Sequence, residues 1–499
     1  MKIAGLDIGT TGCKCTVFDE KGKYLGKAYR DYPVLRSIGN HEIDITAIME
    51  GVYAVIREMA EAFPDIAGLG VTSFGETFVL TDEKGNPLHL AMLYTDPRGA
   101  EECRELTEKT GEKTIANITG LRPHEMYSIS KLMWIKKHQP AIYKEAKHIF
   151  LMEDYVVFHL TGKAQIDYSL ASRTMAFDIH RLDWSDQILE AAGINRKLFS
   201  VCVPSGSIAG TILPEVAART GLSEKVQIVS ISHDQVAAAV GAGAFDKTVA
   251  VDGAGTVECL TPIYEGIPDA DQMYEGYFSV VPYVLPGMYV AYAFSYTGGA
   301  LIQWCVDTFA RERQRKSREQ KISVNTLLEK EYAKKHPEGP SGMLVLPHFA
   351  GAATPYMDTG SKGAILGLTA ASTAADIYRG CMEGVVYEMY LNYQSLAGSG
   401  ICFEKLNATG GGAHSSLWMQ MKADVLNLPI TALKTVDAGT VGCAMLTGVA
   451  IGMFRELKEA ARLMVEETVT YRPRQEIHEK YMRVYERYRK VYEAIRPLM

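Results

Sequence analysis

One short pattern occurs twice in this chain, and it constrains the fold more than any other feature. Residues 2–8 form an apolar run that ends in an acid, and a glycine–threonine turn at 9–12 leads into a second apolar run. Residues 248–251 run in the same way into Asp252 and another glycine–threonine turn. A repeated strand–turn–strand unit indicates an internal duplication. We therefore expect two similar lobes whose turns face each other across a cleft. The lobes would cover residues 1–245 and 246–499.

Strands and helices alternate along the chain, which predicts the α/β class. The apolar spacing from 45 to 62 is that of a helix with one buried face, and the apolar run 66–71 follows as a strand. A second apolar strand at 226–231 precedes a helix rich in small residues. With 499 residues, 47% of them hydrophobic, the chain is long enough to bury two cores.

Charge and cysteine content exclude several classes of partner. Asp and Glu outnumber Lys and Arg by 59 to 52, so the net charge is −7 and offers no basic surface for nucleic acid or an anionic membrane. No stretch approaches the ~18 apolar residues of a membrane span.

The basic residues between 311 and 335 are interspersed with glutamates, which is typical of a solvated helix face. The nine cysteines form no disulfide framework and the first residues do not resemble a signal peptide, so we expect a cytoplasmic protein.

The turn after Asp7 suggests phosphate binding. Glycines and threonines leave backbone N–H groups and hydroxyls free, and such groups form a nest for anions. Asp7 itself could hold Mg²⁺, which prefers one or two carboxylates together with phosphate oxygens. An ordinary β-hairpin would look the same in isolation. The second copy at Asp252 favours a cleft that holds a nucleotide from both sides.

Asp234 follows the strand predicted at 226–231, in the sequence Ser232–His233–Asp234–Gln235. One interpretation of this position is the N-cap of a helix. The other is a carboxylate at the mouth of the cleft, where it accepts the proton of an attacking hydroxyl. A weak base is sufficient there if phosphoryl transfer is loose and the proton leaves late.

Three further segments carry candidate ligand-binding groups. Glycines 410–412 lead from an apolar stretch into a helix and would let the backbone approach a flat ligand closely. They form neither a P-loop nor a dinucleotide fingerprint. Glu76 and the Asp96–Arg98 segment follow strand-like runs of the first lobe, where a carboxylate and a guanidinium could grip vicinal hydroxyls. A purely structural pair between Asp96 and Arg98 is the alternative.

Taken together, these segments resemble the FGGY family of carbohydrate kinases over nearly the whole chain. The matching strings, in order, are DIGTTGCKCTVFDEKG, YTDPR, DYSLASRTMAFDIHRLDWS, SHDQVAAAVGAG, DGAGTVE, FAGAATPYMDTGSKGAILGLT, TGGGAHSSLWMQMKADVLNLPI and DAGTVGCAMLTGVAIG. The resemblance implies an α/β fold of the two-lobed, actin-like ATPase type, in which each lobe has a ribonuclease H-like core. It also implies a kinase that uses ATP and Mg²⁺ to phosphorylate a small sugar or polyol, either a ketose or an alditol.

The resemblance assigns roles to individual residues as well. Asp234 matches the catalytic base and, together with Asp7, the metal site. The positions that match the ATP site are Thr10, Thr11, Gly12, Gly255, Thr256, Gly299, Gly410, Gly411 and Ser415. The positions that match the sugar pocket are Glu76, Tyr94, Asp96, Arg98, Tyr127, Asp234 and Gln235.

The chain departs from the family pattern inside the predicted sugar pocket. Glycerol kinases have Arg before the glutamate that matches Glu76, where this chain has Gly75, and Met126 stands where their pattern has an aromatic residue. Xylulokinases carry Met-His in the segment around Gly75, and His233 departs from both patterns. The resemblance therefore leaves the identity of the acceptor sugar open.

Two other functions are compatible with the motifs. An actin-like or chaperone-like ATPase would hydrolyse ATP without a sugar, and a sugar sensor or scaffold would have an inactive site. The polar groups of the predicted sugar pocket favour a small polyhydroxylated acceptor over the ATPase. The intact hairpins and Asp234 argue against a sensor or scaffold. Homodimers are common in the family, so the resemblance allows a homodimer.

Overall fold

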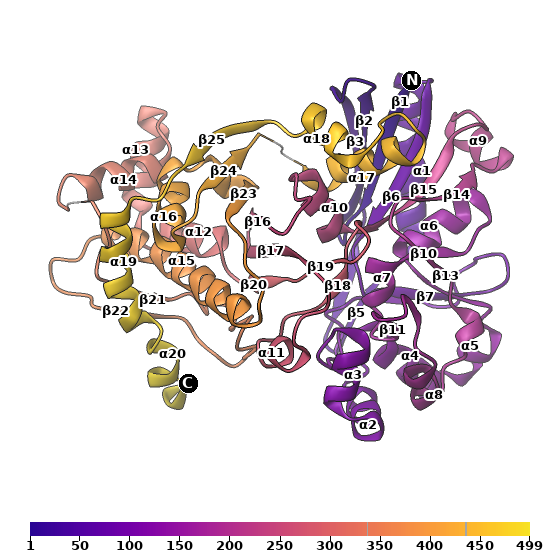
Figure 1. Ribbon diagram of the computed structural model, residues 1–499, viewed down its shortest axis with the longest axis horizontal. Coiled ribbons are helices and arrows are strands. Elements are labelled where there is room, and N and C mark those ends of the chain that lie inside the picture. The colour runs from indigo at the N-terminus through magenta and orange to yellow at the C-terminus, as the bar shows by residue number, and fades with distance from the viewer. Residues whose placement is uncertain (337, 435–436) are drawn as a thin grey trace.

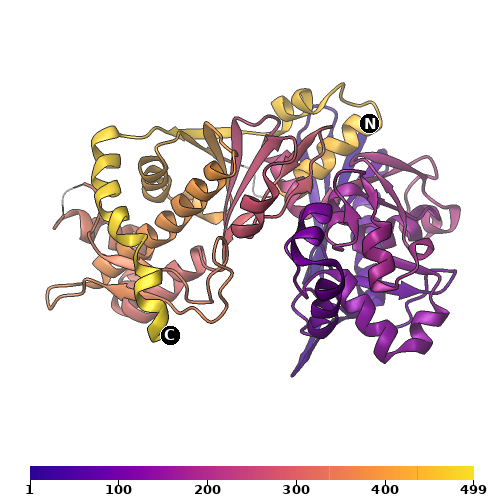
Figure 2. The same ribbon diagram turned by 60° about the horizontal axis from the view of Figure 1, so that its bottom comes forward.

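The computed structural model describes residues 1–336, 338–434 and 437–499. The chain forms two lobes that lie side by side, the first in indigo to magenta and the second in pink to yellow (Figure 1). Each lobe is built on a mixed β-sheet that is covered by helices. Figure 2 shows the lobes joined at the top of the view, where the helices of residues 438–464 reach over the first lobe.

The main sheet of the N-terminal lobe has the strand order β14-β15-β6-β1-β2-β3. Its strands are β1 (Lys2–Ile8), β2 (Gly12–Asp19), β3 (Tyr24–Asp31), β6 (Ile66–Ser73), β14 (Ser207–Thr211) and β15 (Gln227–His233). β1, β2 and β3 form an antiparallel meander, whereas β6 pairs in parallel with both β1 and β15. This is the ribonuclease H-like arrangement implied by the resemblance. The central strands are buried on both faces, which explains their nearly continuous apolar sequences.

Helix α1 (Ile45–Ala62) covers one face of this sheet, and its bounds are those predicted from the apolar spacing. The Asp44 carboxylate caps the helix by accepting a hydrogen bond of 2.8 Å from the Thr46 amide. The buried face of α1, which includes Ile48 and Val52, packs against β2 and β3.

The main sheet of the C-terminal lobe repeats the same plan, with the order β18-β19-β17-β16-β23-β24-β25 and with β20 also paired to β17. Its strands are β16 (Val249–Ala254), β17 (Glu258–Glu265), β18 (Val281–Pro282), β19 (Met288–Val290), β20 (Ala293–Ser295), β23 (Lys405–Thr409), β24 (Ile430–Leu433) and β25 (Glu467–Tyr471). β16 and β17 form an antiparallel hairpin, β16, β23 and β24 run parallel, and β25 closes the edge antiparallel, as β14 does in the first lobe. The internal repeat inferred from the two turns is therefore confirmed.

Smaller elements complete both lobes. A second sheet of the N-terminal lobe, in the order β4-β5-β8-β7-β9, consists of β4 (Val34–Ser37), β5 (Asn40–Ile43), β7 (Phe78–Thr81), β8 (Ala91–Met92) and β9 (His148–Leu151). The other helices of this lobe are α2 (Ala100–Thr110), α3 (Glu112–Thr119), α4 (Ser128–His138), α5 (Pro140–Glu145), α6 (Met152–Thr161), α7 (Tyr168–Ser172), α8 (Asp186–Ala192) and α9 (Pro214–Thr220). Those of the C-terminal lobe include α12 (Gly299–Phe309), α13 (Arg311–Gln320), α14 (Val324–Ala333), α15 (Ala374–Gly398), α16 (Ser416–Leu426), α18 (Leu457–Met464), α19 (Gln475–Tyr488) and α20 (Val491–Ile495). No helix in the described ranges combines the length and the hydrophobicity needed to cross a membrane.

Two crossing helices join the lobes. Helix α10 (Asp234–Gly241) follows β15, and α17 (Ala438–Ala450), from the second half of the chain, packs on β1 and β6 of the first lobe. A Cβ atom on Gly241 would lie 1.9 Å from the Ala438 carbonyl oxygen, and one on Gly442 would lie 1.9 Å from the Ala237 carbonyl oxygen. Glycine at both positions lets the two backbones touch, so the crossing is a tight joint.

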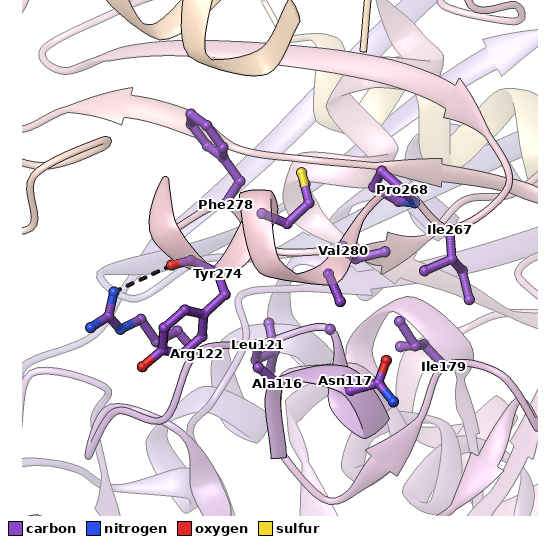
Figure 3. A pocket seen from close by; sticks show the side chains of 13 residues that line it. Ala116, Asn117, Leu121, Arg122, Ile179, Ile267, Pro268, Tyr274, Phe278 and Val280 are labelled. Atoms are coloured by element: carbon purple, nitrogen blue, oxygen red, sulfur yellow. Dashed lines mark hydrogen bonds between the residues drawn. The ribbon is translucent and has the colours of Figure 1, made fainter. Parts of the chain in front are cut away.

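The lobes meet again where α3 faces α11 (Ala270–Glu275). Figure 3 shows Arg122 donating to the Tyr274 carbonyl oxygen, a bond of 3.3 Å. The guanidinium carbon also lies 4.2 Å from the ring centre of Tyr274 and 3.8 Å from that of Tyr277. The cavity between these segments measures about 20 Å³, which is room for about one water molecule. This region is therefore a second contact between the lobes.

Candidate active site

The first predicted phosphate turn is a tight hairpin between β1 and β2. The Gly9 amide donates to the Gly12 carbonyl oxygen over 3.0 Å, which closes the turn. A Cβ atom on Gly12 would lie 2.6 Å from the Arg30 carbonyl oxygen, so a larger residue does not fit there. Thr10 is half-buried and Thr11 is exposed, so the turn faces solvent rather than the core.

Asp7, at the end of β1, is paired with a lysine that was not among the predicted site residues. Lys14 stands opposite Asp7 in the hairpin register, and its Nζ lies 3.0 Å from Asp7 Oδ2. The same Nζ lies 2.9 Å from Oδ1 of Asp437, the residue that caps α17. Burial raises the pKa of Asp7 even though the lysine is close. The cross-strand register of a short hairpin was the sequence signal that could have revealed Lys14.

Asp234 is the first residue of α10, directly after β15. Its side chain is 28% exposed, and its Oδ1 lies 3.2 Å from His233 Nε2. Burial of the carboxyl group raises the pKa of Asp234 to about 7, and the charges of Asp7 and Glu76 add to the shift. Three acids from separate segments of the first lobe therefore lie in one electrostatic neighbourhood.

Glu76 is held by an arginine that the sequence reasoning also missed. Arg173 lies just after α7, and its Nε is 2.7 Å and its Nη2 2.5 Å from Glu76 Oε1. The Ser128 hydroxyl donates to the Glu76 carbonyl oxygen at 2.6 Å and supports a backbone with a φ of 63°, which is rare for a residue with a side chain. Almost a hundred residues separate Arg173 from Glu76. No local spacing in the sequence predicts such a pair.

Asp96 and Arg98 bind each other. Arg98 Nε and Nη2 lie 2.8 Å and 2.7 Å from the two Asp96 oxygens, and the His41 amide donates to Asp96 at 2.8 Å. Arg98 Nη2 also lies 2.6 Å from Glu42 Oε1. The Asp96 side chain has no exposed surface. The Asp96–Arg98 pair that the sequence analysis named as an alternative is therefore formed.

The other predicted sugar-pocket residues are Tyr94, Tyr127 and Gln235. Tyr94 is 40% exposed. Its pKa is raised by partial burial and by the charges of Glu76 and Asp234, which places its hydroxyl near both acids. Tyr127 is buried, with its ring centre 5.3 Å from the guanidinium carbon of Arg173. Gln235 is exposed on the first turn of α10.

A cavity of about 890 Å³ lies beside the second predicted phosphate turn, in the C-terminal lobe. Its size suits a nucleotide. The predicted ATP-site residues in its wall are Gly255, Thr256, Gly299, Gly411 and Ser415. The Gly299 amide donates to the Gly255 carbonyl oxygen at 2.9 Å, which ties α12 to the turn. Gly410 has a φ of 85° and no room for a Cβ atom, which would meet the Ala254 carbonyl oxygen at 2.6 Å. The first-turn residues Thr10, Thr11 and Gly12 belong to the other lobe and are not part of this wall.

The two copies of the repeat differ in their acids. Asp252, the counterpart of Asp7, is buried, and its Oδ2 lies 2.7 Å from Nζ of the equally buried Lys422. Glu258 pairs with the same lysine at 2.5 Å. The second aspartate is therefore sealed into the C-terminal lobe, whereas Asp7 faces the region of Asp234.

A magnesium ion bound to ATP would find few protein ligands here. Within the described part of the chain, no three His, Cys, Asp or Glu side chains form a metal-binding cluster. Mg²⁺ on a nucleotide requires only one or two carboxylates, since phosphate and water oxygens supply the rest. Asp7 and Asp234 fit that requirement.

Sequence models of one protein family match both halves of the chain. The model of the N-terminal domain of the FGGY family of carbohydrate kinases matches residues 2–241, and that of the C-terminal domain matches residues 267–451. The chain belongs to the FGGY family of carbohydrate kinases. Carbohydrate kinases are phosphotransferases, so this FGGY protein is an enzyme of that class.

Relatives of this FGGY protein match it over nearly their whole length. The xylulose kinase of Bacillus subtilis (strain 168) is 27% identical over 484 residues, which cover 96% of this chain and 94% of the relative. The glycerol kinase of Halorhodospira halophila is 30% identical over 495 residues, with coverage of 96% and 93%. The crystal structure of xylulose kinase from Rhodospirillum rubrum superposes with a TM-score of 0.90 at 22% identity, over 100% of this chain and 99% of the other. The predicted two-lobed, actin-like fold is therefore confirmed.

Proposed function

We propose that this FGGY protein transfers the γ-phosphoryl group of ATP to a hydroxyl of a small sugar or polyol, either a ketose or an alditol. The observation that carries the proposal is the position of Asp234, at the start of α10 and within electrostatic reach of Asp7 and Glu76. The acceptor would lie between Asp234 and the wall formed by Glu76, Tyr94 and Tyr127, with Gln235 beside it.

Asp234 would act as the general base. Its carboxylate takes the proton of the acceptor hydroxyl while that oxygen bonds to the γ-phosphorus and the bond to the bridging oxygen of ADP breaks. With a pKa of about 7, Asp234 is a stronger base than an ordinary aspartate and is still largely ionised at slightly alkaline pH. The surrounding acids that raise this pKa are thus part of the mechanism.

Mg²⁺-ATP supplies the phosphoryl group and the metal charge that offsets charge building up on the phosphates. The adenosine would lie in the cavity of about 890 Å³, against Gly299, Gly411 and Ser415, with Gly410 packed behind its wall on Ala254. The phosphates would lie between the two turns, at residues 10–12 and 255–256, with Asp7 and Asp234 toward the metal and Lys14 toward a phosphate oxygen. Residues 1–245 would thus supply the sugar pocket, and residues 246–499 the adenosine site.

An ADP-release assay with a panel of ketoses and alditols tests this function. ADP that appears only with one or a few of these acceptors, together with a phosphorylated product, is the expected result. ADP release that does not depend on a sugar would indicate the actin-like or chaperone-like ATPase instead. Binding of a sugar without ADP release would indicate a sensor with an inactive site.

Replacing Asp7 by alanine should weaken the use of Mg²⁺-ATP. The variant removes a carboxylate predicted to lie near the metal and also frees Lys14 from its 3.0 Å partner. We expect the Mg²⁺ concentration for half-maximal rate to rise, while the KM of the acceptor changes little. An unchanged Mg²⁺ dependence would remove Asp7 from the metal site.

A further inference from the structure

Arg173 is a buried cation with one unused donor. Its side chain is 8% exposed. Nε and Nη2 both bind Oε1 of Glu76, and Nη1 has no hydrogen-bond partner among the described residues. No hydrogen bond to the second Glu76 oxygen, Oε2, occurs within those residues either. The pair therefore leaves a donor and an acceptor free on neighbouring side chains.

An unsatisfied donor of this kind is costly. A buried N–H without a partner destabilises a protein by roughly 1–3 kcal/mol, and more when the group is charged. Natural proteins keep such groups mainly where a ligand or an ordered water meets them. The free Nη1 therefore indicates that an oxygen from outside the protein, of a ligand or of a water molecule, meets it beside Glu76.

The surroundings of Arg173 fix the guanidinium in the sugar pocket. A Cβ atom on Gly75 would lie 3.0 Å from Arg173 Cγ and 3.2 Å from its Cβ, so the arginine occupies the space that a side chain at position 75 would need. The ring centres of Tyr127 and Tyr292 lie 5.3 Å and 5.7 Å from the guanidinium carbon. Tyr292 comes from the C-terminal lobe, and its hydroxyl lies 3.2 Å from His233 Nδ1. Arg173 is thus held between the two lobes, next to Asp234.

From these contacts we infer that Arg173 is a specificity-determining residue that selects uncharged acceptors. Nη1 donates to a hydroxyl or carbonyl oxygen of the acceptor, and Glu76 accepts from an adjacent hydroxyl. The inference rests on the kinase function proposed above and adds a residue and a charge requirement to it.

The charges around Arg173 disfavour a carboxylate on the acceptor. Glu76 binds the edge formed by Nε and Nη2 and already offsets the charge of the guanidinium, so a carboxylate on the acceptor would gain little net attraction from Arg173. A single Nη1 is sufficient for a hydroxyl or a carbonyl oxygen. Glu76 and Asp234 would also repel an anionic acceptor in this partly buried site. Sugar acids should therefore be poor substrates, although they match neutral sugars in size.

The first experiment uses the wild-type enzyme and pairs of acceptors that differ in charge. The best ketose or alditol from the panel is compared with the aldonate of equal chain length, by kcat/KM. We expect the aldonate to be at least about 100-fold poorer, because its carboxylate meets those of Glu76 and Asp234 while the charge of Arg173 is already offset by Glu76. An aldonate that is used within a few-fold of the neutral acceptor would overturn the inference and leave the kinase function intact. If neither neutral nor acidic acceptors release ADP, the proposed function fails and this inference fails with it.

The second experiment tests direct contact with Arg173→Met and a set of monodeoxy analogues of the best acceptor. Arg173→Met should lower kcat/KM by on the order of 10- to 100-fold, mainly through the KM of the acceptor. One deoxy analogue, which lacks the oxygen bound by Nη1, should lose activity with the wild type but little further with the variant. If every analogue loses the same factor with both enzymes, Arg173 only holds Glu76 in place.

Two variants guard against a folding artefact. Arg173→Lys keeps the positive charge but loses the planar fork, and it should show the same dependence on the deoxy position with a smaller loss. Arg379→Met removes another buried arginine, which pairs with Glu383 at 2.9 Å in the C-terminal lobe. This control should lower the melting temperature without changing the ranking of acceptors. ATP affinity in the absence of sugar should be unchanged in Arg173→Met, and a parallel loss of ATP affinity would contradict a role in acceptor selection.

Discussion

Asp234 stands where a helix begins, and helices commonly begin at aspartates for structural reasons alone. Asp234 differs from Asp44, the cap of α1, in the charged groups that surround its carboxylate. Asp44 binds a backbone amide of its own helix, whereas Asp234 lies near Asp7 and Glu76 and has a pKa of about 7. The sequence left both the helix-cap and the catalytic interpretation of Asp234 open, because each aspartate simply precedes or begins a predicted helix. Charges brought in by distant segments favour the catalytic interpretation.

Replacing Asp234 by asparagine should lower kcat by on the order of 10²- to 10⁴-fold and leave ATP binding largely intact. The N-cap of α10 is His233 and the start of the helix has no side-chain capping bond, so α10 should keep its start while the base is lost. Asp44→Asn is the matched control, because it makes the same change at a helix start without a proposed chemical role. Turnover close to that of the wild type in Asp234→Asn would remove this residue from the mechanism.

The rate of phosphoryl transfer should depend on pH with an apparent pKa near 7. The base works when deprotonated, so kcat/KM for the acceptor should be high above pH 7 and fall as Asp234 gains a proton below it. The groups that face Asp234 are Asp7 and Glu76, which raise its pKa, Arg173, which lowers it, and His233, which burial keeps neutral. Arg173→Met should therefore move the midpoint upward. A rate profile without an inflection between pH 6 and 8 would contradict this assignment.

At the scale of elements, the periodic segments were the most predictable. The helix predicted at 45–62 is α1 to the residue, because its apolar stripe and its cap agree. The strand predicted at 248–251 continues as β16 to Ala254, because Asp252, Gly253 and Ala254 still pair with β17 across the hairpin. The sequence alone assigns these three residues to the turn, because Asp and Gly are typical turn residues. Short strands such as β18 and β20 were not predicted, since two or three residues carry no usable period.

The contact between α10 and α17 depends on its glycines, so Gly442→Ala should destabilise the protein by about 1–3 kcal/mol or more. The added methyl group would lie 1.9 Å from the Ala237 carbonyl oxygen, and neither backbone can move without displacing a lobe. Gly398→Ala, at the end of α15, is the control, because a Cβ atom there meets nothing within 4 Å. That change should be neutral or mildly stabilising. Denaturant unfolding compares the two, and equal stability of both variants would disprove a tight joint.

Across the whole molecule, the residues proposed for chemistry lie beside the contacts between lobes. Lys14 of the first lobe binds Asp437, which caps the crossing helix α17. His233 of the first lobe meets Tyr292 of the second at 3.2 Å. A ligand that binds both lobes would therefore bias their relative position, and exclusion of water by the approach of the lobes would favour transfer to sugar over hydrolysis.

An accepted sugar should accordingly tighten the binding of a non-hydrolysable ATP analogue. We expect a several-fold decrease in its Kd, typical of coupling energies of about 1–3 kcal/mol, and by linkage the same factor for the sugar in the presence of the analogue. Calorimetry in both orders of addition measures both effects. A sugar that the enzyme does not phosphorylate serves as the control. Identical affinities with and without the true acceptor would refute coupling between the lobes.

The sequence by itself determined what is local or repeated. It predicted the class of fold, the duplicated hairpins, helix α1 and the strand before Asp234, because periodicity, turn chemistry and repetition are properties of short segments. Only the tertiary structure decided how Arg173 binds Glu76, how Lys14 reaches Asp437, and how Tyr292 of the second lobe meets His233 of the first. Those pairings depend on how separate elements pack, and packing brings charges together that no spacing along the chain relates.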